Sequence, residues 1–193
     1  MTAGKKELPV RAFKSARAWA AWLASNHARS PGVWLRFFKK GSGVASVDHA
    51  EALDEALRYG WIDGQARPRD EKSWLQRFTR RRSRSAWSRR NAERVERLTR
   101  AGAMKAAGLA EAAAAKADGR WAAAYDSPRN AVVPDDFLKA LRRSKKALAF
   151  FDSLNKANRY SIAYRLQTAR KPETRERRLK AILRMMAKGE TFH

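Results

Sequence analysis

The chain contains no cysteine, and this absence excludes several kinds of chemistry. None of its 193 residues forms a disulfide, supplies a thiolate metal ligand or acts as a cysteine nucleophile. Histidine is scarce as well, because only His27, His49 and His193 are present, and their spacing makes no helical pair of metal ligands. We therefore expect no metal, no cofactor and no histidine-based catalytic site.

Long apolar runs are also absent. No run approaches the roughly 20 apolar residues that a transmembrane helix requires. The first residues, MTAGKKELPVRAF, hold lysines but lack the apolar core of a secretory signal. We therefore expect a cytoplasmic protein without a transmembrane segment.

Acidic residues are few relative to basic ones. Lysine and arginine number 43 against 19 aspartates and glutamates, so the formal net charge is +24. A surplus of this size indicates an anionic partner, and nucleic acid is the first candidate. The alternative is compositional, since arginine and alanine are both abundant in GC-rich coding sequences. Such a bias does not explain why the acids are so few.

The remaining composition is typical of a globular protein. Hydrophobic residues make up 44% of the chain and aromatic residues 10%. This is enough to bury a core in one domain or in two small ones. We expect a flexible leader at 1–9, an α+β domain at 10–126, a linker at 127–133 and a helical domain at 134–193.

The N-terminal domain alternates between helix and strand patterns. Capping residues and an apolar stripe predict one helix over 15–27 and a second that begins at Ser46 or Asp48 and runs through Tyr59. Aromatic and β-branched residues predict a strand over 33–40 that is buried on both faces. A second strand over 73–81 is expected to pair with the first, which gives a small antiparallel sheet.

The C-terminal part is predicted to be helical throughout. Pro134 stands near one helix start, and Ser144 and Asn155 are suited to cap two more. Pro172 opens the last helix and Gly189 stops it. We expect a bundle of three or four helices, so the fold class is α+β and predominantly helical.

One tract combines aromatic residues with the densest positive charge. It runs from 74 to 91, WLQRFTRRRSRSAWSRRN, and a helix is expected to begin at Ser85 or Ser88. Exposed aromatic rings stack on bases while guanidinium groups contact phosphates, and six such contacts to duplex give a salt slope of about −5. The alternative is that the tryptophans belong to the core and the arginines form a solvated rim. The nucleic-acid site predicted here comprises Arg80, Arg81, Arg82, Arg84, Arg89, Arg90, Trp74 and Trp87.

A second candidate site lies around residues 60–64, GWIDG. The two glycines predict a helix end that turns through a positive φ. Asp63 within it is interpreted either as a turn acceptor paired with Arg67 or Arg77, or as a general acid or base. We assign no catalytic residue. The predicted ligand pocket comprises Trp34, Trp61, Asp63 and Arg77.

Several segments of the chain act together as markers. They are PGVWLRFFKKGSG (31–43), EALDEALRYGWIDGQ (51–65), the 74–91 tract, GRWAAAYDSP (119–128), and VPDDFLKAL with ARKPETRERRLKAIL in the C-terminal part. Together they resemble a bacterial family, the YdeI or OmpD-associated proteins, also known as bacteriocin-protection proteins. The resemblance covers nearly the whole chain and departs from the family pattern at Arg80, where proline is expected. It implies a role in stress or antimicrobial resistance and supplies no catalytic residue.

The sequence therefore favours a non-enzymatic, strongly basic protein that binds nucleic acid. The alternative is a small-molecule enzyme or ligand-binding protein that uses the pocket near Trp61 and Asp63. A salt-dependent affinity for nucleic acid would distinguish the first from the second.

Overall fold

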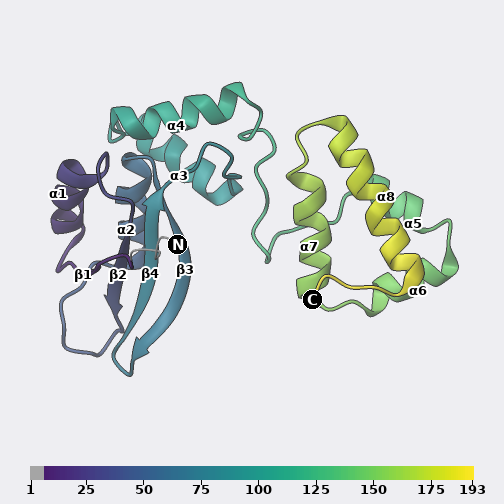
Figure 1. The fold of residues 1–193 in the computed structure, drawn as a ribbon, viewed down its shortest axis with the longest axis horizontal. Coiled ribbons are helices and arrows are strands. Elements are labelled where there is room, and N and C mark those ends of the chain that lie inside the picture. The colour runs from purple at the N-terminus through teal and green to yellow at the C-terminus, as the bar shows by residue number, and fades with distance from the viewer. Residues whose placement is uncertain (1–6) are drawn as a thin grey trace, which may run out of the picture. The chain divides into compact units, whose positions relative to one another are not determined.

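The computed structural model describes residues 7–193, so residues 1–6 of the predicted leader lie outside the described residues. Residues 7–193 form eight helices and one four-stranded sheet, which confirms the predicted α+β class (Figure 1). They divide into two compact units. The sheet unit comprises the residues up to Ser85 together with Arg94–Ala114, and the helical unit comprises Ala86–Glu93 together with Ala115–His193.

The sheet has the strand order β1-β2-β4-β3. The predicted antiparallel pair is confirmed as β2 (Val33–Phe38) and β4 (Ser73–Arg80). A short first strand, β1 (Val10–Ala12), pairs with β2 in parallel, so the sheet is mixed. The fourth strand is β3 (Trp61–Asp70), which pairs with β4 in antiparallel.

The predicted helix end with a positive φ is confirmed at Gly60, but residues 61–64 begin strand β3 instead of continuing a turn. Only Gly60 has a positive φ, 72°, where it ends the preceding helix, and Trp61 already begins the strand. Most of β3 is exposed, and it contains Pro68, which an edge strand tolerates because one side of its backbone has no partner strand. Its charged, proline-containing sequence explains why the pattern did not predict a strand.

Two helices pack against one face of the sheet, as Figure 1 shows. Helix α1 (Ala16–Asn26) is capped by Ser15, whose hydroxyl accepts a hydrogen bond from the Ala18 amide. Helix α2 (His49–Arg58) begins with a capping box, in which Asp48 and Glu51 each accept a hydrogen bond from the other's amide. Both predicted helices are thereby confirmed, with Asp48 rather than Ser46 as the cap.

Tryptophans fill the core of the sheet unit. Trp19 and Trp61 are completely buried, with ring centroids 6.4 Å apart, and Trp19 also packs edge-on against Phe78. Each indole N–H reaches a backbone carbonyl, from Trp19 to Ala52 at 3.0 Å and from Trp61 to His27 at 3.1 Å. A buried indole without such a partner would lose a hydrogen bond that it makes in water.

The division between the two units falls within α3 (Arg89–Arg100) and α4 (Ala106–Ala117). Of the two predicted starts for α3, Ser88 is confirmed, since its hydroxyl accepts a hydrogen bond from the Asn91 amide. Trp87 therefore precedes the helix instead of lying within it.

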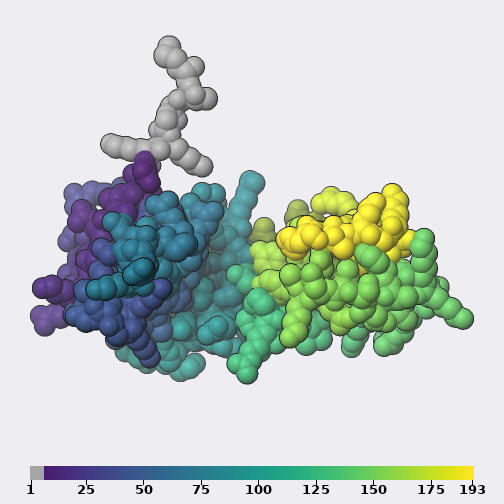
Figure 2. All heavy atoms as spheres, turned by 90° about the horizontal axis from the view of Figure 1, so that it is seen from below, coloured from purple at the N-terminus to yellow at the C-terminus, as the bar shows by residue number. Residues whose placement is uncertain are grey.

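The helical unit has a core of aliphatic, phenylalanine and methionine side chains. Ser144, Asn155 and Gly189 act as the predicted helix boundaries, and Gly189 has a φ of 75°. Its last helix and the residues after it lie on the surface of this unit (Figure 2, yellow). All seven tryptophans of the chain precede its last four helices. These helices are α5 (Asp135–Leu141), α6 (Lys145–Ser153), α7 (Lys156–Gln167) and α8 (Pro172–Lys188).

None of the helices formed by residues 7–193 is both long and apolar enough to cross a membrane.

Candidate nucleic-acid interface

The strand β4 ends in a turn that presents three arginines to solvent. Arg80, Arg82 and Arg84 are exposed, and we name this set the arginine turn. Arg81 between them is only 6% exposed, and its amide donates a 3.0 Å hydrogen bond to the carbonyl of Gly60. The Ser85 hydroxyl accepts a hydrogen bond from the Arg82 amide at 3.2 Å, and the Ser85 amide donates to the Arg82 carbonyl. The backbone of the arginine turn is therefore held on both sides.

The three guanidinium groups of the arginine turn have no carboxylate partner in the part of the chain that the structure describes. Within residues 7–193, Arg80, Arg82 and Arg84 form no ion pair. Arg90, in the first turn of α3, is likewise exposed and forms no ion pair in this part of the chain. Their positive charge is therefore not neutralised by the protein itself.

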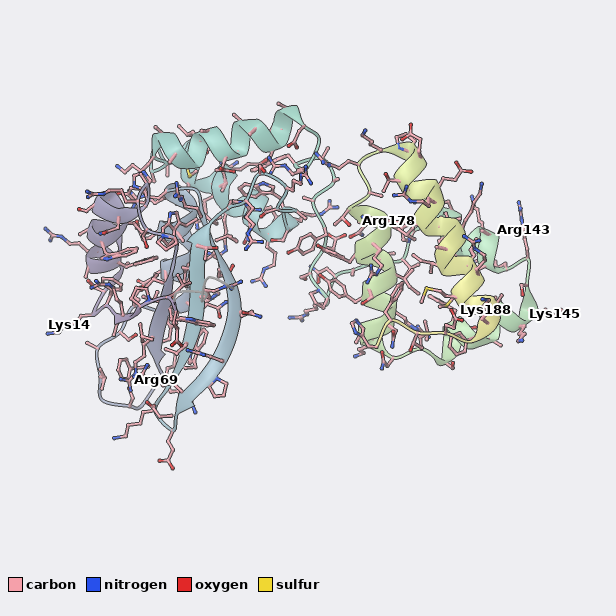
Figure 3. All side chains as sticks on the ribbon, in the orientation of Figure 1. Lys14, Arg69, Arg143, Lys145, Arg178 and Lys188 are labelled. Atoms are coloured by element: carbon pink, nitrogen blue, oxygen red, sulfur yellow. The ribbon has the colours of Figure 1, made fainter. Side chains whose placement is uncertain are left out.

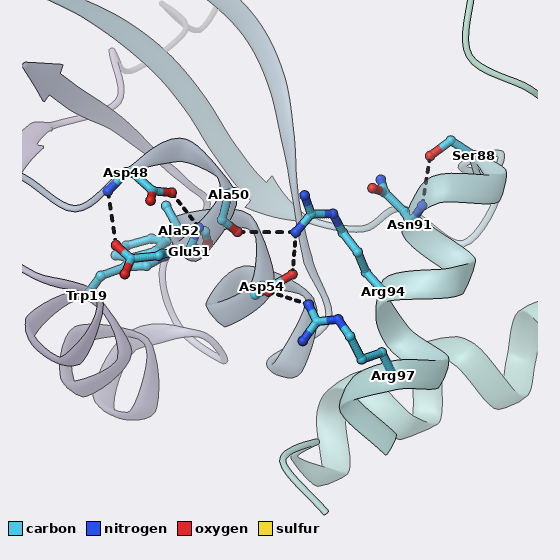
Figure 4. A network of polar contacts seen from close by, with 10 residues as sticks. All are labelled: Trp19, Asp48, Ala50, Glu51, Ala52, Asp54, Ser88, Asn91, Arg94 and Arg97. Carbon is cyan, nitrogen blue, oxygen red and sulfur yellow. Dashed lines mark hydrogen bonds and ion pairs between the residues drawn. The ribbon is translucent and has the colours of Figure 1, made fainter. Parts of the chain in front are cut away.

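Other arginines of the same tract are committed to acids. Arg94 and Arg97 both bind the carboxylate of Asp54 in α2, at 2.6 and 2.5 Å, which ties α3 to α2 (Figure 4). Arg89 lies 2.8 Å from Asp126. With Arg81 buried and Arg89 paired, four of the six predicted phosphate contacts stay free, and the expected salt slope on duplex becomes about −3.6.

The two tryptophans of the predicted site do not lie in this turn. Trp87 is 1% exposed and packs against Trp121 with ring centroids 4.8 Å apart, so its ring cannot stack on a base. Trp74 is half-buried and stacks on Phe37 at 4.7 Å. It stands six residues before Arg80 on the same strand, which separates them by about 20 Å at ~3.4 Å per residue.

The structure does not bring together the four residues of the predicted ligand pocket. Trp34 lies opposite Arg77 in the register of β2 and β4, whereas Asp63 lies opposite Phe78, the next residue of β4. Because successive residues of a strand point to opposite faces, Trp34 and Arg77 lie on one face of the sheet and Asp63 on the other. Trp61 is completely buried in the core.

Asp63 pairs with a histidine rather than with Arg67 or Arg77. Its Oδ2 lies 3.2 Å from Nε2 of His49, which contacts the rings of Phe37 and Trp74. Fourteen residues separate His49 from Asp63, so no sequence spacing indicated the pair, and only the packing of α2 on β3 creates it. Within residues 7–193, no group of three or more histidines and acids has an arrangement that would hold a metal ion.

On the opposite face of the sheet, arginine side chains lie over aromatic rings. The Arg67 guanidinium lies 4.4 Å from the centre of the Trp34 ring, and the Arg36 guanidinium lies 4.4 Å from that of Phe38. Arg36 also donates to Asp70 at 2.8 Å. These arginines stabilise the sheet and are not free for a partner.

The helical unit carries a second group of free cations that the sequence analysis did not single out. Arg142, Arg143, Lys145 and Lys146 flank Ser144 between α5 and α6, and all four are exposed. None of them forms an ion pair within the described chain. Figure 3 shows Arg143 and Lys145 at the outer edge of the helices.

Comparison with protein families identifies both halves of the chain. Residues 130–189 match the family described as Bacteriocin-protection, YdeI or OmpD-Associated. Over these residues the chain carries a YdeI/OmpD-associated domain. Residues 11–111 match a second description, Domain of unknown function (DUF8412). No curated protein and no solved structure matched the chain.

The YdeI/OmpD-associated match covers α5 to α8, including the cations around Ser144. The arginine turn lies in the DUF8412 match. The N-terminal segments that resembled the YdeI/OmpD-associated family also fall in DUF8412, while residues 119–128 fall in neither match. The resemblance is therefore confirmed, and the part of the chain that the YdeI/OmpD-associated family accounts for is its C-terminal third.

Proposed function

We propose that this YdeI/OmpD-associated protein binds nucleic acid by electrostatic contact with the phosphate backbone, as a non-enzymatic protein of the cytoplasm. The observation that carries the proposal is the arginine turn, three exposed guanidinium groups without a carboxylate partner in the described chain. Cations in this state gain most from a phosphate, since binding releases counterions from the nucleic acid and breaks no ion pair of the protein. The family description supports a role in protection against antimicrobial stress.

The backbone of the arginine turn is ordered, and this also favours phosphate binding. The Arg81 amide and the contacts between Arg82 and Ser85 fix the backbone before a ligand arrives. Less conformational entropy is then lost on binding than in a loose basic tail. Arginine also donates two parallel hydrogen bonds to one phosphate, which lysine cannot do.

Sequence recognition is not part of the proposal. Trp87 is buried and Trp74 lies far from the arginine turn, so neither tryptophan of the predicted site is placed to stack on a base beside it. Phosphate contacts position a protein on nucleic acid without reading the bases. We therefore expect similar affinity for unrelated sequences of the same length and strand number.

The test is fluorescence anisotropy of labelled DNA and RNA, single- and double-stranded, across a salt series. The variant Arg80→Ser, Arg82→Ser, Arg84→Ser removes the arginine turn and leaves the buried Arg81 in place. We expect it to reduce the slope of log affinity against log salt by about 2.7, at about 0.9 per lost contact on duplex.

The matched control removes three exposed cations that also lack ion pairs in the described residues, by Lys14→Ser, Arg17→Ser and Lys39→Ser. It has the same net charge as the test variant, so a site-specific effect separates the two. An equal loss in both would reduce the proposal to generic charge, and so would a slope near zero for the unchanged protein. Binding to anionic lipid vesicles, with none to nucleic acid, would replace it by a membrane-surface role.

A further inference from the structure

The helical unit contains a cavity that neither family description accounts for. Its volume is about 530 Å³, and it lies between the segment 128–133 and the helices α5, α6 and α7. Cavities of roughly 300–1,000 Å³ are typical of small-molecule sites. Val133, Leu138 and Phe151 supply apolar wall, so the cavity has an apolar interior.

Three cations line the same cavity, and no carboxylate does. They are Arg129, Lys156 and Arg159. None of the three forms an ion pair with a residue in the described part of the chain. An apolar wall with uncompensated positive charge is complementary to a molecule that is apolar over most of its surface and negatively charged at one end.

Arg159 has a buried hydrogen-bond donor without a partner in the described residues. Its guanidinium lies 5.2 Å from the centre of the Phe151 ring, and Nη2 donates to the carbonyl of Asp152 at 2.7 Å. Its Nε is buried and finds no acceptor among residues 7–193. A buried donor is costly to leave unpaired, and an anionic oxygen in the cavity would supply the acceptor.

Tyr160 adds a neutral donor to the lining. Burial raises the pKa of its hydroxyl, with smaller contributions from Tyr164 and Asp126, so the group stays protonated at neutral pH. The carboxylate of Asp126 is itself occupied, because it lies 2.8 Å from Arg89 and accepts a hydrogen bond from Gln167 at 3.1 Å. It therefore does not neutralise the cations of the cavity.

We propose that this cavity is a binding site for a small organic anion, an apolar body that carries a carboxylate or a comparable acidic head group. Arg159 and Lys156 bind the head group, and Val133, Leu138 and Phe151 contact the apolar body. Apart from Pro128 and Arg129, the lining of the site lies within the YdeI/OmpD-associated match, and it contains no residue of the arginine turn. It does not depend on the proposed nucleic-acid binding, so each proposal can fail without the other.

The test uses two dyes that differ mainly in charge. The first, 8-anilinonaphthalene-1-sulfonate, carries an apolar ring system and one sulfonate. The second, N-phenyl-1-naphthylamine, has the same rings and no charge. Both are titrated into the full chain, and the dissociation constants are taken from dye fluorescence at moderate salt.

Two variants act on the two halves of the site. Lys156→Met with Arg159→Met removes charge and keeps most of the bulk, whereas Ala131→Trp fills part of the cavity from its wall. The matched controls are Lys145→Met with Lys146→Met, which removes the same amount of charge, and Ala149→Trp, all at exposed positions outside the cavity. Circular dichroism verifies that each variant retains its helices.

We expect the double methionine variant to weaken binding of the sulfonate dye by at least about tenfold and to leave the neutral dye unchanged. Ala131→Trp should weaken both dyes, and the controls neither. The proposal is overturned if the sulfonate dye does not bind, or if the cavity variants affect it no more than the controls do. If the double variant does not fold, Ala131→Trp and the single change Lys156→Met decide the matter.

Discussion

The two units use their arginines in different ways. In the sheet unit many of them are occupied: Arg67 covers Trp34, Arg36 bridges Phe38 and Asp70, and Arg94 and Arg97 bind Asp54. The arginine turn is the exception in that unit. In the helical unit Arg89 and Arg175 pair with acids, whereas the cations around Ser144 and those lining the cavity have no acid partner in the described residues. The net charge of +24 therefore includes cations that are paired within the protein and cations that are not. Only the unpaired cations can bind an anionic partner without breaking an ion pair of the protein.

The units also differ in how tightly their helix ends are enclosed, and two glycines with nearly the same φ measure this. Gly60 ends α2 and Gly189 ends α8. A Cβ on Gly60 would meet the carbonyl of Ala107 at 3.1 Å, whereas one on Gly189 would meet only the Phe150 ring at 3.7 Å. We expect Gly60→Ala to lower the free energy of unfolding by about 2–3 kcal/mol and Gly189→Ala by about 1 kcal/mol.

Chemical denaturation of the two variants followed by circular dichroism measures this difference. Equal losses would show that the enclosure of α2 by α4 adds nothing to the conformational strain.

The two arginines on Asp54 test how much the paired cations of the sheet unit contribute to its stability. Asp54→Asn removes the charge that Arg94 and Arg97 share, and the half-buried Arg94 is left with weaker hydrogen bonds. We expect a loss of about 1–2 kcal/mol in the free energy of unfolding. Glu96→Gln, an exposed acid of α3 without an ion pair in the described residues, is the control and should change it by less than about 0.5 kcal/mol. If Asp54→Asn left the free energy of unfolding unchanged, the two ion pairs would contribute no more to stability than ordinary surface pairs do.

The smallest effect concerns pH and an exposed pair of the helical unit. A hydrogen bond from Arg175 holds the pKa of Asp136 below its ordinary value of 3.8. A lowered pKa in the folded state stabilises the protein above the unfolded pKa, and this contribution is lost as the pH falls through the folded value. We expect Asp136→Asn to reduce the loss of stability below about pH 4, by less than about 1 kcal/mol because the pair is exposed.

Acid titration of the thermal midpoint checks this prediction. Asp135→Asn serves as the control, since Asp135 forms no ion pair in the described chain. A titration curve of the Asp136 variant that matches that of the control variant would contradict the prediction.

The sequence predicted those elements whose signals are local. The caps at Ser15, Asp48, Ser144 and Asn155 could be read directly, since a capping residue acts within three positions of itself. The pairing of β2 with β4 also followed from its pattern. The strand β3 could not be predicted, because Pro68 and its charges are tolerated only at a sheet edge, and the edge is a property of the whole sheet.

The candidate sites show the same limit. Exposure could not be read within the run of arginines, so Arg81 was grouped with Arg80 and Arg82 although it is buried. The predicted pocket combined Trp34 and Asp63, which the sheet register places on opposite faces. The cavity at Arg159 gave no sequence signal, because its lining comes from the segment 128–133 and from helices that meet only in the fold.

The position of the tryptophans determines what fluorescence can report. None of them lies in α5 to α8, so intrinsic indole emission does not observe these helices directly, whereas far-ultraviolet circular dichroism does. If the two signals separate during denaturation, α5 to α8 unfold as an independent domain. The variant Ala131→Trp would place an indole at the cavity and give the YdeI/OmpD-associated domain its own optical reporter.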